Sequence, residues 1–252
     1  MRKKVTPLQA VDWSLQFPYS DGGIADSVPE AHAALCAASI PDVPAAAWRY
    51  VKTLDFAIGR ASDGPLGFFK KLWYAWKLEP YAERYTRRAE LVPEWREQHG
   101  LHEASLYVAG NESLPDAANM VALAEILLRI ARLSFFDDVR YVVAARTYVR
   151  EAKHVIANGF APCDAWSYVR AELVEARIRV LQGNTREASE LLGSIVAHVL
   201  GEGEPWLGFA DLTGKQKHAI LHACIPLLFA LDDDALAERS LGWVMHASPF
   251  PA

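Results

Sequence analysis

Apolar residues recur along most of this chain at the spacing of α-helices, whereas the alternation typical of strands is hard to find. From residue 111 onward, turn and capping residues divide the pattern into six helices. Short connections should pair these helices into three antiparallel hairpins. The expected helices cover about 115–135, 138–158, 165–182, 185–200, 215–231 and 232–246.

The hairpins are expected to begin near residues 116, 164 and 214, so they repeat about every 50 residues. A regular period of that length favours stacked helical hairpins, an α-solenoid, over a closed four-helix bundle. The predicted fold class is therefore all-α. Residues 111–252 would form a three-hairpin, repeat-like region, and residues 1–110 a less regular helical region before it.

Prolines divide the N-terminal region, because proline suits the first turn of a helix but interrupts its interior. Two short helices are expected near 29–39 and 44–60, each with a proline in its first turn. Pro65 precedes a further helical segment. We expect Pro80 and Pro93 to divide that segment into short helices.

The segment Phe68–Arg88 combines six basic residues with seven aromatic ones, in a chain whose formal net charge is −5. Two glutamates leave the segment at +4, so the rest of the chain carries −9. Before Pro80, one apolar arc of about 100° has the spacing of a buried face and is expected to point into the core. It consists of Phe69, Leu72, Trp73 and Trp76.

A second set of residues in this segment forms a candidate binding surface. Two tyrosines and two arginines beyond the proline share one stripe at i, i+3, i+4 and i+7, and two lysines lie together on a flank of the preceding turns. Arginine can pair with phosphate and tyrosine can stack on a base, so the stripe suits nucleic acid; it also suits an acidic protein. Alternatively, the stripe lines the rim of a helix-packing interface, with Glu83 and Arg87 forming an i, i+4 pair. The candidate binding residues are Tyr81, Arg84, Tyr85, Arg88, Lys70 and Lys77.

The hairpin expected within Ala171–Val196 has small residues, Ala176 and Ala188, where its two helices would approach closely. A Gly-Asn pair would make its turn, and Leu192 falls where a large apolar residue packs between helices. In these features the segment resembles a tetratricopeptide unit of the divergent kind found in bacterial regulators. The resemblance implies a repeat-like fold that binds other proteins, and it implies no chemistry.

The same segment departs from that family at Glu172 and Glu175, where a large aromatic residue and a leucine are usual. The resemblance also covers only this short part of the 252 residues.

Composition indicates a folded protein, because 52% of the residues are hydrophobic and 23% are charged. Cys36, Cys163 and Cys224 are far apart and form no CxxC pair, which indicates buried, reduced thiols in a cytosolic protein. No apolar signal segment follows the N-terminus, and the longest apolar run, Cys224–Leu231, is too short to span a bilayer. We therefore expect a cytoplasmic protein without a membrane partner.

The signatures of phosphate-binding loops, dinucleotide folds, serine hydrolases and zincins do not occur in this sequence. His218 and His222 lie at the edge of an apolar helical arc, where core-edge or surface histidines are a better interpretation than metal ligands. Glu151 and His154 form a lone ExxH pair, whereas a di-iron site needs two. The acidic run 232–234 suits a helix start. No catalytic residue, metal or cofactor is predicted.

The expected function is therefore a non-enzymatic interaction module, an adaptor or scaffold of a bacterial-type cytosolic assembly that docks another protein or peptide. The alternative is a helical subunit of a nucleoprotein complex that contacts the nucleic-acid backbone through residues 68–88. A third possibility is an enzyme without a recognisable motif.

Overall fold

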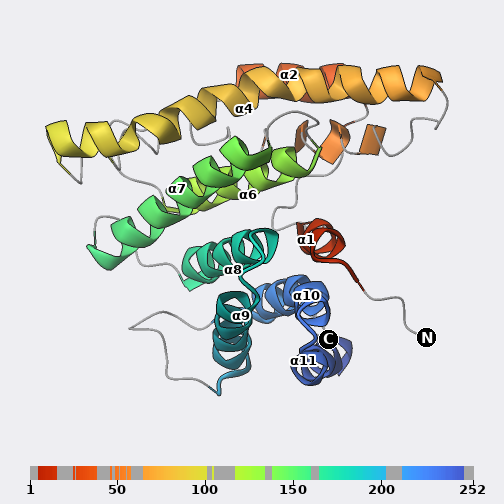
Figure 1. Cartoon of the computed structure of the whole chain (residues 1–252), viewed down its shortest axis with the longest axis vertical. Helices are drawn as coiled ribbons and strands as arrows, with labels where there is room; N and C mark the ends of the chain where they lie inside the picture. The colour runs from red at the N-terminus through yellow and green to blue at the C-terminus, as the bar shows by residue number, and fades with distance from the viewer. Residues whose placement is uncertain are drawn as a thin grey trace. The chain divides into compact units, whose positions relative to one another are not determined.

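The computed structural model is all-helical over the residues it describes, and no strand occurs among them (Figure 1). The structure forms two compact units, of which unit 1 combines Met1–Tyr19 with Pro162–Ala252 and unit 2 is Ser20–Ala161. The described residues are 5–15, 25, 27–38, 46, 49–50, 52–54, 56–57, 65–100, 104, 117–133, 138–159, 165–202 and 212–246.

Unit 2 is built around one very long helix. The helices of this unit are α2 (Val28–Ala37), α4 (Pro65–His99), α6 (Ala117–Leu133) and α7 (Asp138–Ala157). The α6 and α7 helices pack against each other, and both contact α4 (Figure 1). At the start of α2, the Ser27 hydroxyl accepts a hydrogen bond from the Glu30 backbone N–H, as in an N-cap.

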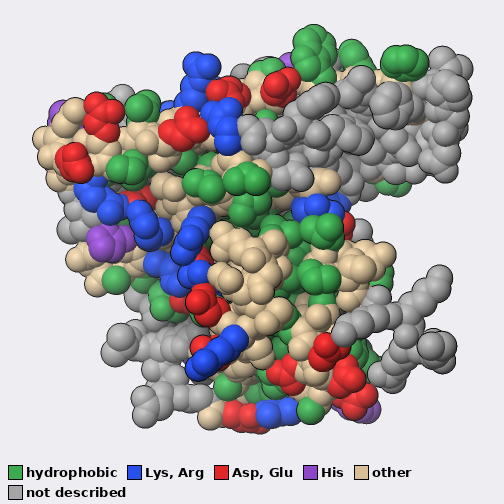
Figure 2. Space-filling model, viewed as in Figure 1, with side chains coloured by type: hydrophobic (Ala, Val, Ile, Leu, Met, Phe, Trp, Pro, Cys, Tyr) green, Lys and Arg blue, Asp and Glu red, His purple; other side chains and the backbone are tan. Residues whose placement is uncertain are grey.

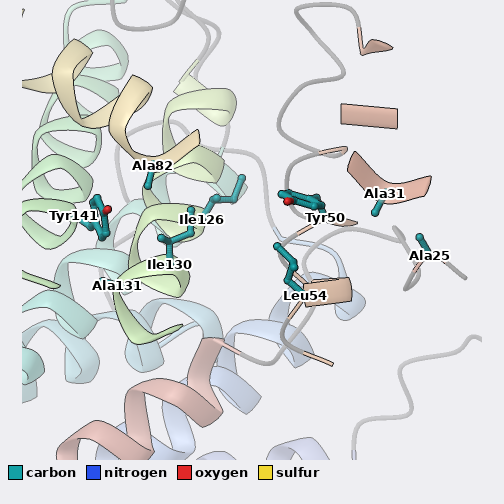
Figure 3. Packing of buried hydrophobic residues seen from close by; sticks show 9 residues of the cluster. All are labelled: Ala25, Ala31, Tyr50, Leu54, Ala82, Ile126, Ile130, Ala131 and Tyr141. Carbon is teal, nitrogen blue, oxygen red and sulfur yellow. The ribbon is translucent and has the colours of Figure 1, made fainter. Parts of the chain in front are cut away.

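The core of unit 2 joins these helices to the helical residues around Tyr50 and Leu54 (Figure 3). Ile126 and Ile130 of α6 lie near Tyr141 of α7 in this cluster. Burying such side chains is the main driving force for packing the helices together. The whole cluster is Ala25, Ala31, Tyr50, Leu54, Ala82, Ile126, Ile130, Ala131 and Tyr141.

The α4 helix runs through Pro80 and Pro93 without a break, so the expectation that these prolines divide the segment was wrong. Each proline removes one intrahelical hydrogen bond, but it does not prevent the flanking turns from making theirs. Both prolines are exposed, and carbonyls on the solvent side of a helix can tilt outward to water. Figure 1 shows α4 as one long, gently curved helix.

Unit 1 brings the start of the chain together with its C-terminal helices. The helices of this unit are α1 (Pro7–Leu15), α8 (Ala165–Leu181), α9 (Thr185–Leu200), α10 (Gly214–Ala230) and α11 (Asp234–His246). The α8–α9 and α10–α11 pairs form hairpins, and α1 packs against α8 and α10. Helix α1 was not predicted from the sequence.

Local signals explain where several helices of unit 1 begin and end. Thr213 and Gln216 form a capping box at the start of α10, with each side chain bonded to the backbone of the other residue. The α9 helix ends at Gly201, whose φ of 76° lies in the left-handed region that favours glycine. These two signals mark the two ends of the connection between α9 and α10.

The six helices expected after residue 111 are all present within a few residues of their predicted limits, and they pair as predicted. The hairpin that resembles a tetratricopeptide unit buries Ala176, Ala188 and Leu192, as close helix packing requires. The expected boundary at residues 110–111 lies outside the described residues.

Candidate interaction surface

The inward face of α4 is defined by its second half. Ala82, Tyr85, Thr86, Ala89 and Val92 are all buried there. At about 100° per residue these positions share one side of the helix, which faces the core of unit 2. Because α4 is continuous, the opposite side must face outward along both halves.

Three large aromatic residues occupy that outward side in the first half of α4. Phe69 is 64% exposed, Trp73 is 49% exposed and Trp76 is 62% exposed. The prediction that these residues form the buried arc was therefore wrong. We call Phe69, Trp73 and Trp76 the aromatic crest. Figure 2 shows hydrophobic side chains standing out along the outer edge of α4, with Lys and Arg side chains farther along the helix.

Charge is segregated between the two flanks of α4. Measured around the helix from Phe69, all five glutamates fall within about 60° on one side of the crest, and four basic residues fall within about 40° on the other. The acidic flank consists of Glu79, Glu83, Glu90, Glu94 and Glu97. The basic flank consists of Lys70, Lys77, Arg84 and Arg88.

Helix α7 neutralises part of the acidic flank. Arg140 donates to Glu83 at 3.1 Å and to Glu90 at 3.0 Å. Arg87 also donates to Glu83 at 2.9 Å, which confirms the predicted i, i+4 pair. The hydrogen bond from Arg87 lowers the pKa of Glu83 most, Arg140 adds to this effect, and desolvation opposes it. Thus α7 faces the acidic flank, and the basic flank lies on the other side of the crest.

The four-residue stripe predicted for binding does not lie uniformly at the surface. Tyr85 is only 7% exposed, and its backbone carbonyl accepts a hydrogen bond from the Tyr148 hydroxyl at 3.3 Å. Arg84 is exposed, whereas Arg88 is half-buried with its guanidinium 6.0 Å from the centre of the Tyr85 ring. Tyr85 therefore belongs to the core of unit 2, and its ring makes a cation–π contact with Arg88.

The side chains of Tyr81, Lys70 and Lys77 lie outside the described part of the structure. Their backbone positions are helical, so their places around α4 follow from the register of the helix. Lys70 and Lys77 continue the flank that carries Arg84 and Arg88.

Glu151, which the sequence analysis rejected as a metal ligand, has a structural role in unit 2. Glu151 is completely buried and forms an ion pair with Arg96 of α4, whereas His154 is exposed. Burying a carboxylate is costly unless it is paired, so Arg96 holds α4 and α7 together at this end. Within the described ranges, no three His, Cys, Asp or Glu side chains are grouped so that they could hold a metal ion.

His218 and His222 lie at the edge of the buried side of α10, as predicted: His218 is half-buried and His222 is exposed. The His218 and His222 ring centroids are 6.3 Å apart, and Cys224 beside them is fully buried. Partial burial, followed by the nearby His218, lowers the pKa of His222. Burial raises the pKa of Cys224 to about 12, so its thiol is inert at neutral pH. The side chains of Cys36 and Cys163 are not among those that the structure describes.

The sequence interpretation also missed an outward stripe on α7. Val139, Val143, Arg146 and Arg150 are exposed and share one side of the helix. This side is opposite the buried stripe of α7, which includes Ala145, Val149 and Ala152. A helical-wheel projection of the sequence of α7 locates both stripes.

Over the residues that the structure describes, no helix is long and apolar enough to cross a bilayer. No protein-family model, curated protein or solved structure matches this chain.

Proposed function

We propose that the protein is a non-enzymatic, cytosolic adaptor that binds an acidic segment of another protein along the basic flank of α4. The single observation that carries this proposal is the segregation of charge on α4, where all the glutamates lie on one flank and Lys70, Lys77, Arg84 and Arg88 on the other.

Intramolecular packing supplies a cation to the acidic flank through Arg140 of α7. The basic flank faces away from α7 and has the opposite sign to the chain as a whole, whose net charge is −5. Complementary charge fixes the register of a partner and speeds its encounter with the surface. Carboxylates are the natural partners, because arginine binds a carboxylate with two parallel hydrogen bonds.

The two arginines, Arg84 and Arg88, differ in burial. Arg88 sits over the ring of the buried Tyr85, so part of its side-chain entropy is already lost before a partner binds. Arg84 is exposed one turn earlier. A pre-ordered arginine beside an exposed one suits a surface in which Arg88 is the central anchor and Arg84 completes the contact.

The helical hairpins support the adaptor part of the proposal. Hairpins such as α8–α9, with close contacts at buried alanines, are the units from which stacked repeat proteins are built. We include in the proposal a solenoid-like stacking of the hairpins, as the tetratricopeptide resemblance implies, with protein binding rather than catalysis as their role.

A random-peptide display library panned against the immobilised full chain tests this proposal. We expect the enriched peptides to combine acidic and apolar residues. Their binding should be lost in the charge-reversal variant Arg84→Glu/Arg88→Glu, and it should persist in Arg146→Glu/Arg150→Glu. The second variant has the same spacing and the same change of charge on the exposed side of α7, so it is a matched control.

Selected peptides that bind both variants equally, or peptides without acidic residues, would contradict the proposal. The nucleoprotein alternative is tested with a labelled single-stranded oligonucleotide. If it binds more tightly than the selected peptides, and if affinity falls steeply between about 50 and 200 mM salt, the partner is nucleic acid instead.

A further inference from the structure

The aromatic crest presents an unusual surface for a helix of a folded unit. Phe69, Trp73 and Trp76 are spaced i, i+4 and i+7, so their side chains form one ridge along about two turns. Each keeps about half of its surface or more in water, where apolar contact costs free energy that burial would recover. The ridge is convex, so its side chains would insert into a binding partner rather than form a pocket for one.

The charge around the crest is positive. Lys70 and Lys77 follow one side of the crest within Pro65–Pro80, which contains only one acidic residue, Glu79. Lys71 falls at the register of the inward side of the helix and does not add to this charge. Helices that lie at a bilayer surface combine Trp, Phe and Leu on one side with lysine or arginine around it. Tryptophan is also enriched at the level of lipid headgroups, where its ring is apolar and its N–H can still donate.

We propose that the first half of α4, Pro65–Pro80, lies on an anionic lipid surface and inserts Phe69, Trp73 and Trp76 among the acyl chains. Lys70 and Lys77 contact the acidic headgroups. Charge complementarity selects this occupant, because anionic lipids are gathered on the cytoplasmic leaflet and attract nearby basic residues. The expectation of no membrane partner was based on the lack of a spanning segment, and a helix that lies on the surface needs none.

Two other occupants fit this half of the helix less well. A protein partner would need a deep groove to accept three adjacent aromatic rings, whereas a lipid layer deforms around them. Single-stranded nucleic acid is bound in a positively charged groove whose aromatic side chains stack on the bases, whereas the crest is a convex ridge. The proposal thus adds a lipid-binding crest to the adaptor. The crest shares Lys70 and Lys77 with the protein-binding flank, whereas Arg84 and Arg88 belong to that flank alone.

Sedimentation of the full chain with lipid vesicles tests the proposal. We expect binding to vesicles of phosphatidylcholine with phosphatidylglycerol, and little binding to phosphatidylcholine alone. The variant Phe69→Ser/Trp73→Ser/Trp76→Ser should bind about 100-fold more weakly or worse. Replacing Lys70 and Lys77 by glutamine should weaken binding about fivefold for each lysine.

The matched control is Val139→Ser/Val143→Ser, which removes exposed apolar groups from α7 of the same unit and should leave vesicle binding unchanged. Far-UV circular dichroism verifies that each variant is folded. A second measurement needs no variant: lipids brominated near the headgroup should quench part of the tryptophan fluorescence of the wild-type chain.

No binding to anionic vesicles, no quenching by brominated lipid, or equal losses in the crest and control variants would each overturn the proposal. The proposal would also be overturned if the vesicles did not quench the tryptophan fluorescence of the bound protein and a single-stranded oligonucleotide displaced it completely. The crest variant retains Arg84 and Arg88, so it should still bind the peptides selected on the wild-type chain. Failure of the lipid proposal and failure of the adaptor proposal are therefore separate results.

Discussion

Arg177 of α8 binds Ser14 of α1 with two hydrogen bonds, although 163 positions separate the two residues along the chain. Its Nε donates to the Ser14 hydroxyl at 2.9 Å, and its Nη2 donates to the Ser14 carbonyl oxygen at 2.8 Å. The carbonyl belongs to the last turn of α1, where the negative end of the helix dipole favours a cation. Arg177 is completely buried, so this contact fastens the start of the chain to the C-terminal helices.

Removal of this contact should destabilise unit 1 strongly. Arg177→Ala should lower the free energy of unfolding by about 3–5 kcal/mol, because it removes two charged hydrogen bonds and leaves a cavity. Ser14→Ala keeps the backbone contact and should cost less, about 1–3 kcal/mol. Urea unfolding followed by circular dichroism measures both. As the control, Arg186→Ala removes an almost fully exposed arginine and should change nothing measurable; equal effects of Arg177→Ala and Arg186→Ala would refute the assignment.

Pro80 distinguishes a continuous α4 from two separate helices. In a continuous helix, Pro80→Ala restores a backbone hydrogen bond and removes a clash, so it should raise the free energy of unfolding by about 1–3 kcal/mol. Thermal and urea unfolding of the variant provide the test. If Pro80 instead began a new helix, alanine would give no such gain, because proline suits the first helical turn.

Glu83 should make the stability of unit 2 depend on pH. Arg87 and Arg140 lower the pKa of Glu83 in the folded state below its ordinary value of 4.5. The stabilisation is therefore fully present above pH 4.5 and is lost as the pH falls through the lower, folded pKa. We expect wild type to melt at a higher temperature than Glu83→Gln at pH 7, and the difference to vanish in acid. A difference that persists after Glu83 is protonated would exclude this ionisation as its source.

Much of the fold could be predicted because the helices after residue 111 carry strong local signals. In α9, for instance, the turn at Gly183 and the left-handed Gly201 mark both ends, and Ala188, Leu192 and Ile195 repeat at helical spacing. Helix α1 carries weaker signals: it is nine residues long and is stabilised by α8 and α10, far away in sequence. Such a contact cannot be read from local spacing.

The orientation of α4 could not be predicted for a related reason. Periodicity located the arc of Phe69, Trp73 and Trp76 correctly but could not say which side of the helix meets the core. The orientation of α4 is set beyond Pro80, where Tyr85 and Ala89 pack against the core. The same orientation applies to the first half because the helix continues through the proline. The assumption of a break at Pro80 removed the link between the two halves.

The accessibility of single cysteines along α4 tests most directly whether the crest faces outward, on which the lipid proposal depends. In a chain whose native cysteines are replaced by serine, a cysteine would be introduced in turn at Phe69, Trp73, Trp76, Ala82 and Ala89. Labelling with a water-soluble maleimide under native conditions should be fast at the first three positions and slow at the last two. Slow labelling at all three crest positions would show that the aromatic residues are buried after all and would contradict the account.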